Sequence, residues 1–238
     1  MKDNLTEKVN VLAGGSSISP TLVGYMEPAQ ETNTFTVSGA VTDSTGASDS
    51  IALLEDPEAG MDQETIDSFK NSWGIKVSLV AYDSSCTNLI NYLLEYIGEE
   101  AEAVVPIATT TADINTGVYS FENVEPGKYV LIFERAGALP LFSYVDVVDA
   151  NVSNVNKTLI CGNLVADTAI SDTDLDPIFA AFGVSYFDDD NTAYNAQYDI
   201  AADFSLNDVD LGTIFTNFGA DMTYYNENAI NDVFAALE

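Results

Sequence analysis

The feature that most constrains this chain is an internal duplication in its C-terminal third. Residues 162–183 (GNLVADTAISDTDLDPIFAAFG) align without gaps on residues 198–219 (YDIAADFSLNDVDLGTIFTNFG), at an offset of 36 residues. Nine of the 22 aligned positions are identical, including the Phe-Gly that ends each copy. A duplication of this kind indicates one folding unit that occurs twice, with the two units burying each other's apolar faces.

Each copy joins an oxygen-rich loop to an amphipathic segment. Leu, Ile, Phe and Phe recur at i, i+3, i+4 and i+7, which is the spacing of one helix face, and the closing glycine is a typical helix stop. We expect these apolar residues to form a core between two helices, with Phe179 and Phe215 inside that core rather than on an interface. A final helix is expected over about 222–237, where apolar residues again recur at helical spacing.

The loops carry oxygen atoms at several positions where an EF-hand loop binds calcium. Those positions are 1, 3, 5, 7, 9 and 12, with glycine at position 6. Position 3 has no oxygen-bearing side chain in either copy (Val165 and Ala201), and position 6 is Thr168 or Phe204. Loop 199–210 keeps three acidic ligands and loop 163–174 two, so calcium suits the second loop better. The candidate ligands are Asn163, Asp167, the Ala169 carbonyl, Ser171 and Asp174 in the first loop, and Asp199, Asp203, the Ser205 carbonyl, Asn207 and Asp210 in the second.

A metal-free interpretation of the same loops stays open. Aspartates that precede a helix accept hydrogen bonds from the free amides of its first turn and interact favourably with its dipole. The loops would then keep their fold without calcium.

Residues 34–160 have a strand-like pattern. Short runs rich in Val, Ile, Tyr, Phe and Thr are separated by turn signals such as Asn115–Gly117 and Glu125–Gly127, which favours an all-β sandwich of the immunoglobulin or prealbumin type. The segment Cys86–Gly98 has helical spacing instead and predicts a short inserted helix. The expected strands are 34–41, 75–82, 118–124, 128–136, 142–150 and 155–160.

A change in composition near residue 160 predicts a domain boundary. No Lys or Arg follows Lys157, whereas acidic residues continue to the end. The predicted fold therefore has two domains, a β-sandwich at 34–160 and an all-α, duplicated EF-hand-like domain at 161–238. Residues 1–33 are rich in Gly, Ser and Pro and are expected to be a tail or linker, which could lend a strand around 9–13.

Charge and composition exclude several functions. With 38 acidic and 7 basic residues the formal charge is -31, which disfavours nucleic acid and anionic membranes as partners. The chain has no histidine, so Ser-His or Cys-His nucleophiles and His-ligated metals are impossible. The acidic runs at 99–100 and 188–190 are best explained as solvated turns, and we expect no enzyme. The two cysteines, Cys86 and Cys161, allow either one bridge or two thiols.

Two further expectations concern the membrane and the cell compartment. No run approaches the roughly 18 apolar residues of a transmembrane helix. The opening MKDNLTEKVN lacks the apolar core of a signal peptide, and we expect a fragment of a longer secreted protein, located outside the cell or on a bacterial cell surface.

The repeat resembles a bacterial cellulosome-type dockerin. The resemblance rests on two copies of [ND]-x-x-x-D-x-x-[IL]-[SN]-D-x-D-L, on each closing Phe-Gly and on the lead-in YNAQYD (194–199). Upstream segments 37–43, 75–85, 109–148 and 155–159 resemble a carboxypeptidase-regulatory-like sandwich, the kind that serves as an X-module before a dockerin. This resemblance implies a cohesin domain of a scaffoldin or surface anchor as partner, normally with two calcium ions. It implies partner contacts at Asp172, Thr173, Phe179 and Ala180 in copy one and Asp208, Val209, Phe215 and Thr216 in copy two.

One alternative is a glycan-binding or adhesive β-sandwich with a degenerate EF-hand appendage. Tyr82, Tyr119, Tyr129 and Tyr144 are the candidate sugar platform. Such a platform requires exposed, coplanar rings.

Overall fold

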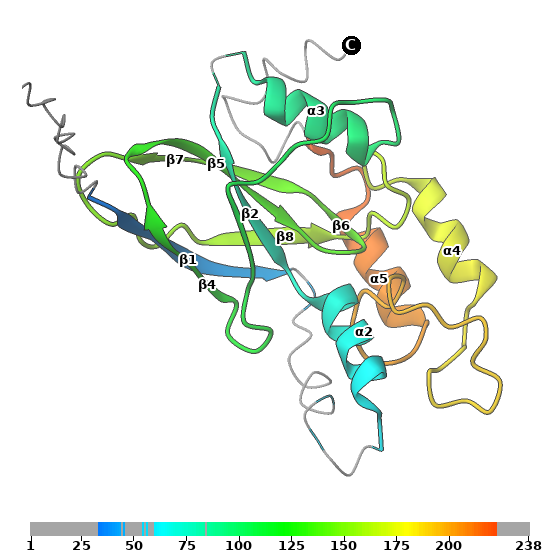
Figure 1. The fold of residues 1–238 in the computed structure, drawn as a ribbon. Helices are drawn as coiled ribbons and strands as arrows, with labels where there is room; N and C mark the ends of the chain where they lie inside the picture. Colours follow the sequence, from blue (N-terminus) through cyan, green and yellow to red (C-terminus); the bar gives the residue numbers. More distant parts are fainter. Residues whose placement is uncertain are drawn as a thin grey trace, which may run out of the picture. The chain divides into compact units, whose positions relative to one another are not determined.

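Two four-stranded sheets face each other in the computed structural model, which describes residues 33–222 except 44, 46–53, 55, 57–59 and 84 (Figure 1). The predicted tail lies outside these residues apart from its last position, and so does nearly all of the predicted helix at 222–237. Alternation along the strands explains the layers, because side chains two residues apart share a face. Val37 and Val41 of one sheet and Val77 and Leu79 of the other all point into the shared core.

The first sheet has the order β4-β1-β8-β6. Its strands are β1 (Phe35–Asp43), β4 (Val118–Val124), β6 (Ala138–Leu139) and β8 (Lys157–Cys161). β1 runs antiparallel to β4 and parallel to β8. Gly39 of β1 is required by close packing, because a Cβ there would lie 2.2 Å from the carbonyl oxygen of Val155.

The second sheet has the order β3-β2-β5-β7 and is antiparallel throughout. Its strands are β2 (Lys76–Ala81), β3 (Ala108–Thr111), β5 (Gly127–Glu134) and β7 (Leu141–Val147). α3 (Thr87–Tyr96) lies over its outer face (Figure 1) and buries Leu89 and Leu93. The predicted sandwich, its six strands and the inserted helix are therefore confirmed, whereas the short strands β3 and β6 were not predicted.

Helix α2 (Gln63–Trp73) was also missed by the sequence analysis. Asp62 caps it by accepting a hydrogen bond from the Thr65 amide at 2.8 Å. The helix ends at Gly74, whose N–H donates to the Lys70 carbonyl at 2.8 Å. Its buried residues Phe69 and Trp73 are four apart, a signal obscured by the polar residues around them.

The prediction of an all-α C-terminal domain was wrong. After β8 the described residues contain a 3-10 turn at Asp172–Asp174, the six-residue α4 (Leu175–Ala180) and the ten-residue α5 (Asp208–Asn217), and most of the rest is loop. β8 leads directly into the first loop, where an EF-hand would have a helix. The helical spacing in the sequence was real, but each helix ends after one to three helical turns.

The repeat also does not form a core of its own. Its buried residues Ile170, Ile178, Leu206 and Ile214 belong to one apolar cluster with the sandwich residues. The strands and the repeat are parts of one compact unit. The domain boundary near residue 160 stays a prediction.

Candidate functional site

The first loop of the repeat is closed by the buried carboxylate of Asp174. One of its oxygens accepts hydrogen bonds from the amides of Leu164 (2.7 Å) and Val165 (2.9 Å), and the other accepts one from the amide of Ser171 (2.8 Å). The Ser171 hydroxyl accepts in turn from the Thr173 amide, which completes a capping box. This carboxylate thus fixes the start of the loop against the start of the helix.

Asp210 closes the second loop in the same way. Its carboxylate accepts hydrogen bonds from the amides of Ala201 (3.0 Å) and Asn207 (2.9 Å), and Asn207 caps α5 through the Val209 amide at 2.7 Å. Each of these residues lies 36 positions after its counterpart in the first copy. The duplication seen in the sequence is therefore repeated in the hydrogen bonds.

The two copies are joined by reciprocal backbone bonds. The amide of Gly183 donates to the carbonyl of Leu206 at 2.7 Å, and the amide of Gly219 donates to the carbonyl of Ile170 at 2.9 Å. Two further pairs of bonds are equivalent in the same way. In one pair the Leu206 amide donates to the Val184 carbonyl and the Ile170 amide to the Ala220 carbonyl. In the other pair the Tyr186 amide donates to the Phe204 carbonyl and the Met222 amide to the Thr168 carbonyl. The end of each copy pairs with the loop of the other, so the two copies lie side by side with equivalent contacts, as the duplication predicts.

Loop position 1 differs between the copies. The Asn163 amide nitrogen donates to the Tyr96 hydroxyl (2.7 Å) and to the Asp167 carbonyl (3.0 Å). Asp199 is buried and accepts hydrogen bonds from the Tyr194 hydroxyl at 2.6 Å and from the amides of Asp203 and Phe204. Burial raises the pKa of Asp199 to about 7, although these hydrogen bonds oppose the shift. The second loop therefore holds a carboxyl group that titrates near neutrality.

Hydrogen bonds engage several of the predicted calcium ligands in this arrangement. Among the described residues, no group of three Asp, Glu, Cys or His side chains is placed to hold a metal ion. The carboxylate oxygens of Asp174 and Asp210 accept backbone amide hydrogen bonds instead, and burial raises the pKa of Asp210 to about 6. Calcium in loop 199–210 stays a prediction, and the geometry described here does not depend on it.

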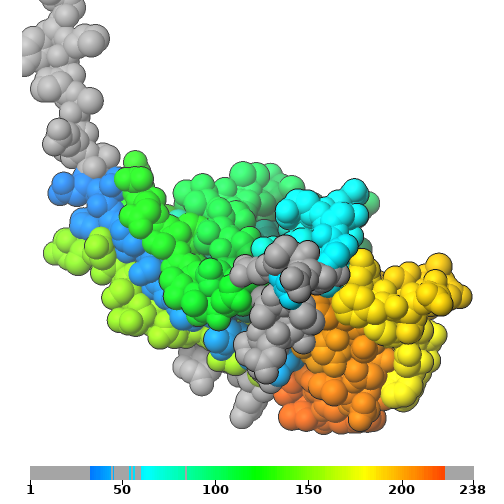
Figure 2. Space-filling view, turned by 90° about the horizontal axis from the view of Figure 1, so that it is seen from below, coloured from blue at the N-terminus to red at the C-terminus, as the bar shows by residue number. Residues whose placement is uncertain are grey.

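All eight predicted partner-binding residues are exposed. In copy one these are Asp172, Thr173, Phe179 and Ala180, and in copy two Asp208, Val209, Phe215 and Thr216. Figure 2 shows the repeat, coloured yellow to orange-red, as an open surface of the unit. The expectation that Phe179 and Phe215 belong to the core was wrong, because they are 58% and 59% exposed. Only the isoleucine of each stripe, Ile178 and Ile214, is fully buried.

Two more exposed phenylalanines were missed as surface residues. Phe182 and Phe218 are both 51% exposed. Phe182 follows the end of α4, and Phe218 is the residue that caps α5. Together with Phe179 and Phe215 they form two equivalent pairs, which we call the first pair (Phe179, Phe182) and the second pair (Phe215, Phe218). The only signal in the sequence was the Phe-x-x-Phe-Gly ending, which helical spacing assigned to the core.

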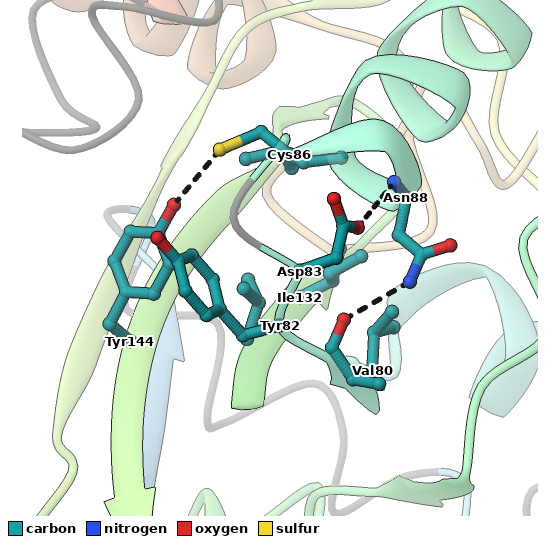
Figure 3. Close-up of a pocket in the computed structure, with 10 residues that line it drawn as sticks. Val80, Tyr82, Asp83, Cys86, Asn88, Ile132 and Tyr144 are labelled. Atoms are coloured by element: carbon teal, nitrogen blue, oxygen red, sulfur yellow. Dashed lines mark hydrogen bonds between the residues drawn. The ribbon is translucent and has the colours of Figure 1, made fainter. Parts of the chain in front are cut away.

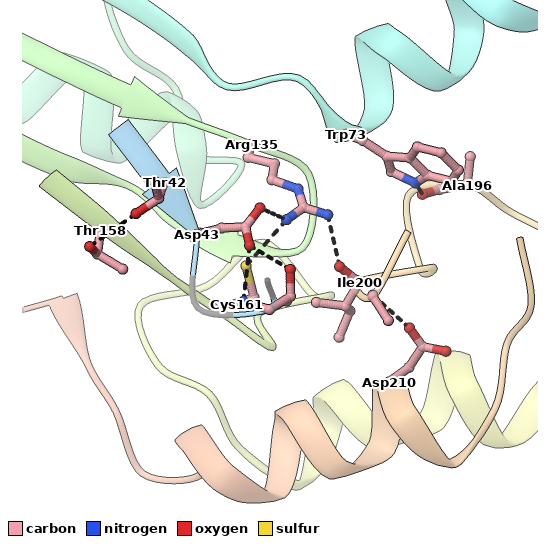
Figure 4. Close-up of polar contacts among 11 residues, drawn as sticks. Thr42, Asp43, Trp73, Arg135, Thr158, Cys161, Ala196, Ile200 and Asp210 are labelled. Carbon is pink, nitrogen blue, oxygen red and sulfur yellow. Dashed lines mark hydrogen bonds and ion pairs between the residues drawn. The ribbon is translucent and has the colours of Figure 1, made fainter. Parts of the chain in front are cut away.

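Arg135 connects the sandwich to the second loop (Figure 4). It follows β5, is buried, and forms an ion pair with Asp43 at the end of β1. The same guanidinium donates to the Ile200 carbonyl at 2.8 Å and to the Cys161 sulfur at 3.7 Å. Because a buried guanidinium needs several acceptors, these bonds fix loop 199–210 to the two sheets.

An aromatic cluster supports the same loop from the side of α2. The ring of Phe204 lies 5.1 Å from Phe69 and 5.0 Å from Trp73, both in edge-on arrangements. The indole N–H of Trp73 donates to the Ala196 carbonyl at 3.1 Å (Figure 4). Phe204 occupies loop position 6 with a positive φ of 65°, a conformation that favours glycine. Burial of its ring offsets that strain.

The tyrosines considered as an alternative sugar platform do not form one. Tyr119 and Tyr129 are buried. Tyr82 and Tyr144 meet at 83° with their ring centroids 5.1 Å apart (Figure 3). The small pocket beside them has a volume of only about 10 Å³ and is lined by residues such as Cys86, Asn88 and Ile132. These rings pack against each other and present no flat exposed surface.

The remaining candidate residues have simple structural roles. The acidic runs at 99–100 and 188–190 are exposed. Cys86 is half-buried at the start of α3, Cys161 is buried in β8, and no disulfide joins them. In the described ranges no helix has the length and apolar character needed to span a membrane.

The fold is similar to the folds of several proteins with solved structures. No protein-family model and no curated protein matches the sequence. Two of the similar structures are type II cohesin–X-dockerin complexes from Acetivibrio cellulolyticus, one an N-terminal and the other a C-terminal interface mutant. Each matching chain is 18% identical, with TM-scores of 0.51 and 0.52. The alignments cover 80% of this chain and 99% of the other. At this level of identity the likeness concerns the fold.

Proposed function

We propose that this chain is a non-catalytic attachment module that binds a cohesin domain through its loop–helix repeat. In this proposal it takes the X-dockerin part of a cellulosome-type assembly, and the sandwich holds the repeat in place. The observation that carries the proposal is the presence of two equivalent phenylalanine pairs, each residue more than half exposed, on a frame closed by hydrogen bonds.

Exposed aromatic rings on a rigid frame favour protein binding. Large apolar side chains that gather on a surface commonly mark interaction sites, and a few aromatic anchors often supply most of the binding energy. The frame here is held by the Asp174 and Asp210 carboxylates and by the reciprocal backbone bonds. Little loop ordering would then be needed on binding, which lowers its entropic cost.

The second copy is the better candidate for the main binding face. Its loop position 11 is Val209, which is 52% exposed, where the first copy has Thr173. Its helix α5 has ten residues and α4 only six, so the second face offers a longer apolar surface around Phe215. The sandwich also supports this copy directly through Arg135.

The negative charge of the chain indicates which charged residues surround the docking surface of the partner. Asp172 and Asp208 are exposed at the starts of the helical segments, and the described residues after Lys157 include no Lys or Arg. A cohesin with basic residues around its docking surface would match this field and associate faster at low salt.

The likeness to chains of cohesin–X-dockerin complexes supports the proposal at the level of fold. Two further expectations belong to it. The module acts outside the cell or on a bacterial cell surface, and any calcium it takes up is held in loop 199–210 by Asp199, Asp203, Asn207, Asp210 and the Ser205 carbonyl. A bound calcium ion would supply a positive charge that orders these oxygens.

A calorimetric titration against a panel of cohesin domains, type II included, tests the proposal. Each titration is run with added calcium and again with EDTA. We expect saturable one-to-one binding to at least one cohesin. Binding that persists in EDTA would show that the hydrogen-bonded loops suffice without the ion. A complete lack of binding across the panel under both conditions would rule out the proposed function.

A further inference from the structure

A cavity of about 250 Å³ lies between α3 and the outer face of the second sheet. Strand alternation creates it. Val77 and Leu79 point into the sandwich core, so Lys76, Ser78 and Val80 point outward beneath α3. Ser78 is paired across the strands with Ile132 of β5, and that residue also lines the cavity. The floor is therefore a row of side chains fixed by the sheet.

A second cavity of about 270 Å³ adjoins the first. The two share Lys76, Tyr96 and Glu134 in their walls. We call the combined space the α3 cleft. No residue of the loop–helix repeat lines it, although the Tyr96 hydroxyl accepts a hydrogen bond from Asn163 of the first loop.

The floor of the cleft contains a buried hydroxyl without a partner. Ser78 is only 2% exposed, and within the described part of the chain its Oγ makes no hydrogen bond. A polar atom left unsatisfied in this way destabilises a folded protein, and a ligand that bonds to it would remove that cost. Ser78 faces the cleft, because its strand neighbours on that face, Lys76 and Val80, also line it.

The other polar groups of the cleft are arranged around Glu134. The Tyr92 hydroxyl donates to its carboxylate at 2.9 Å, and Lys76 Nζ lies 3.0 Å from the same carboxylate. Burial raises the pKa of the Tyr92 hydroxyl, which keeps it protonated as a donor. The cleft thus offers a cation, a carboxylate and hydroxyls within a short space.

One wall of the cleft is aromatic. The rings of Tyr92 and Tyr96, one helical turn apart on α3, lie nearly parallel at 15° with their centroids 6.3 Å apart. Both residues line the cavity, together with Val80 and Ile132. An apolar wall opposite a few fixed polar groups is the usual composition of a small-molecule site.

The charged residues of the cleft disfavour an anionic ligand. Lys76 is the cation of the first cavity, which also holds two acidic residues, Glu95 and Glu134. A phosphate, sulfate or carboxylate would meet a net negative charge there. A molecule with one C–H face and several hydroxyls satisfies the aromatic wall, Glu134 and Ser78 at once.

We propose that the α3 cleft binds a neutral pyranose sugar, with one sugar face against the rings of Tyr92 and Tyr96 and its hydroxyls bonded to Ser78, Lys76 and Glu134. The sugar is either a free monosaccharide or the end of a polysaccharide chain. The cleft differs from the tyrosine platform considered in the sequence analysis, whose rings are buried or edge-on.

Saturation-transfer NMR on the full chain tests this site. The probes are glucose, xylose, galactose and N-acetylglucosamine, each compared with a short oligosaccharide of the same sugar. We expect saturation transfer to at least one sugar, and amide shifts on titration that centre on Ser78, Tyr96 and Glu134. Tighter binding of the oligosaccharide would identify a chain end, and equal binding would identify a free sugar. No transfer to any probe would overturn the proposal.

The variant Ser78→Ala separates a ligand from a structural origin of the unpartnered hydroxyl. We expect sugar binding to weaken about tenfold, because one hydrogen bond in a buried site is lost, while the melting temperature stays the same or rises. The matched control is Ser120→Ala on the exposed face of β4, which should leave sugar binding unchanged. Wild-type affinity in Ser78→Ala would overturn the assignment.

Discussion

The two copies of the repeat share a hydrogen-bond pattern but differ in how the rest of the molecule supports them. In both, an aspartate at loop position 12 closes the loop, and a Phe pair is exposed. Position 6, however, is the exposed Thr168 in copy one and the buried Phe204 in copy two. Copy two is also fixed by Arg135. Identical positions therefore set the local geometry, whereas the differing positions decide how each copy is held to the rest of the chain.

The largest expected difference between the copies is at loop position 6. Phe204→Ala removes a buried ring from the aromatic cluster and should lower the free energy of unfolding by about 3–5 kcal/mol. The equivalent change Thr168→Ala affects an exposed side chain and should stay within about 0.5 kcal/mol. Urea unfolding of both variants measures the difference. Equal destabilisation by the two changes would mean that the copies are supported alike.

Removal of the Arg135 side chain should have the next largest effect. Arg135→Met leaves the Asp43 carboxylate and the Ile200 carbonyl without their buried donor, which should cost about 3 kcal/mol. Hydrogen exchange followed by mass spectrometry gives the location of the change. We expect faster exchange in loop 199–210 and little change in loop 163–174. Similar loss of protection in both loops would contradict a specific connection to copy two.

The smallest of these effects concerns pH and loop position 1. Burial raises the pKa of Asp199 from 3.8 to about 7. The folded chain therefore holds a proton on this carboxyl at pH values where the unfolded chain has lost it, and this stabilises the fold fully below about pH 4. The contribution declines as the pH rises through 7. Between pH 5 and 8, stability should fall by roughly 2–3 kcal/mol, at about 1.4 kcal/mol for each pH unit between the two pKa values.

Asp199→Asn is the matched variant, because copy one carries Asn163 at the same loop position. It cannot ionise, so its unfolding free energy should vary less with pH over that range. The comparison is made by urea unfolding in EDTA to exclude divalent cations. An unchanged pH dependence in the variant would show that another group is responsible.

The strands were predictable because each is short, rich in β-branched or aromatic residues and bounded by turn signals. The predicted 118–124 and the observed β4 coincide. α2 was missed because Phe69 and Trp73 lie among polar residues, so its apolar face is narrow. β6 has only two residues and gives no periodic signal.

The repeat shows that hydrophobic periodicity predicts a helix but not its length. Helical spacing placed Leu175, Ile178, Phe179 and Phe182 on one face, but it could not give the length of the helix, which ends at Ala180. In both copies one isoleucine reaches the core and the phenylalanines remain outside, although α5 is longer than α4. The role of Phe204 depends on Phe69 and Trp73, which are distant in sequence, and no local pattern contains that contact.

We propose that copy two presents the main docking face for a cohesin. The most direct test is a calorimetric titration that uses a cohesin known to bind the wild-type chain. This cohesin is titrated into two double variants, the second-pair variant Phe215→Ala/Phe218→Ala and the first-pair variant Phe179→Ala/Phe182→Ala. Val148→Ala, at an exposed position of the sandwich, is the control. We expect the second-pair variant to weaken binding by about 30-fold or more. The first-pair variant and the control should change it by less than about threefold. Wild-type affinity in the second-pair variant, or a loss of binding confined to the first-pair variant, would contradict a main docking face on copy two.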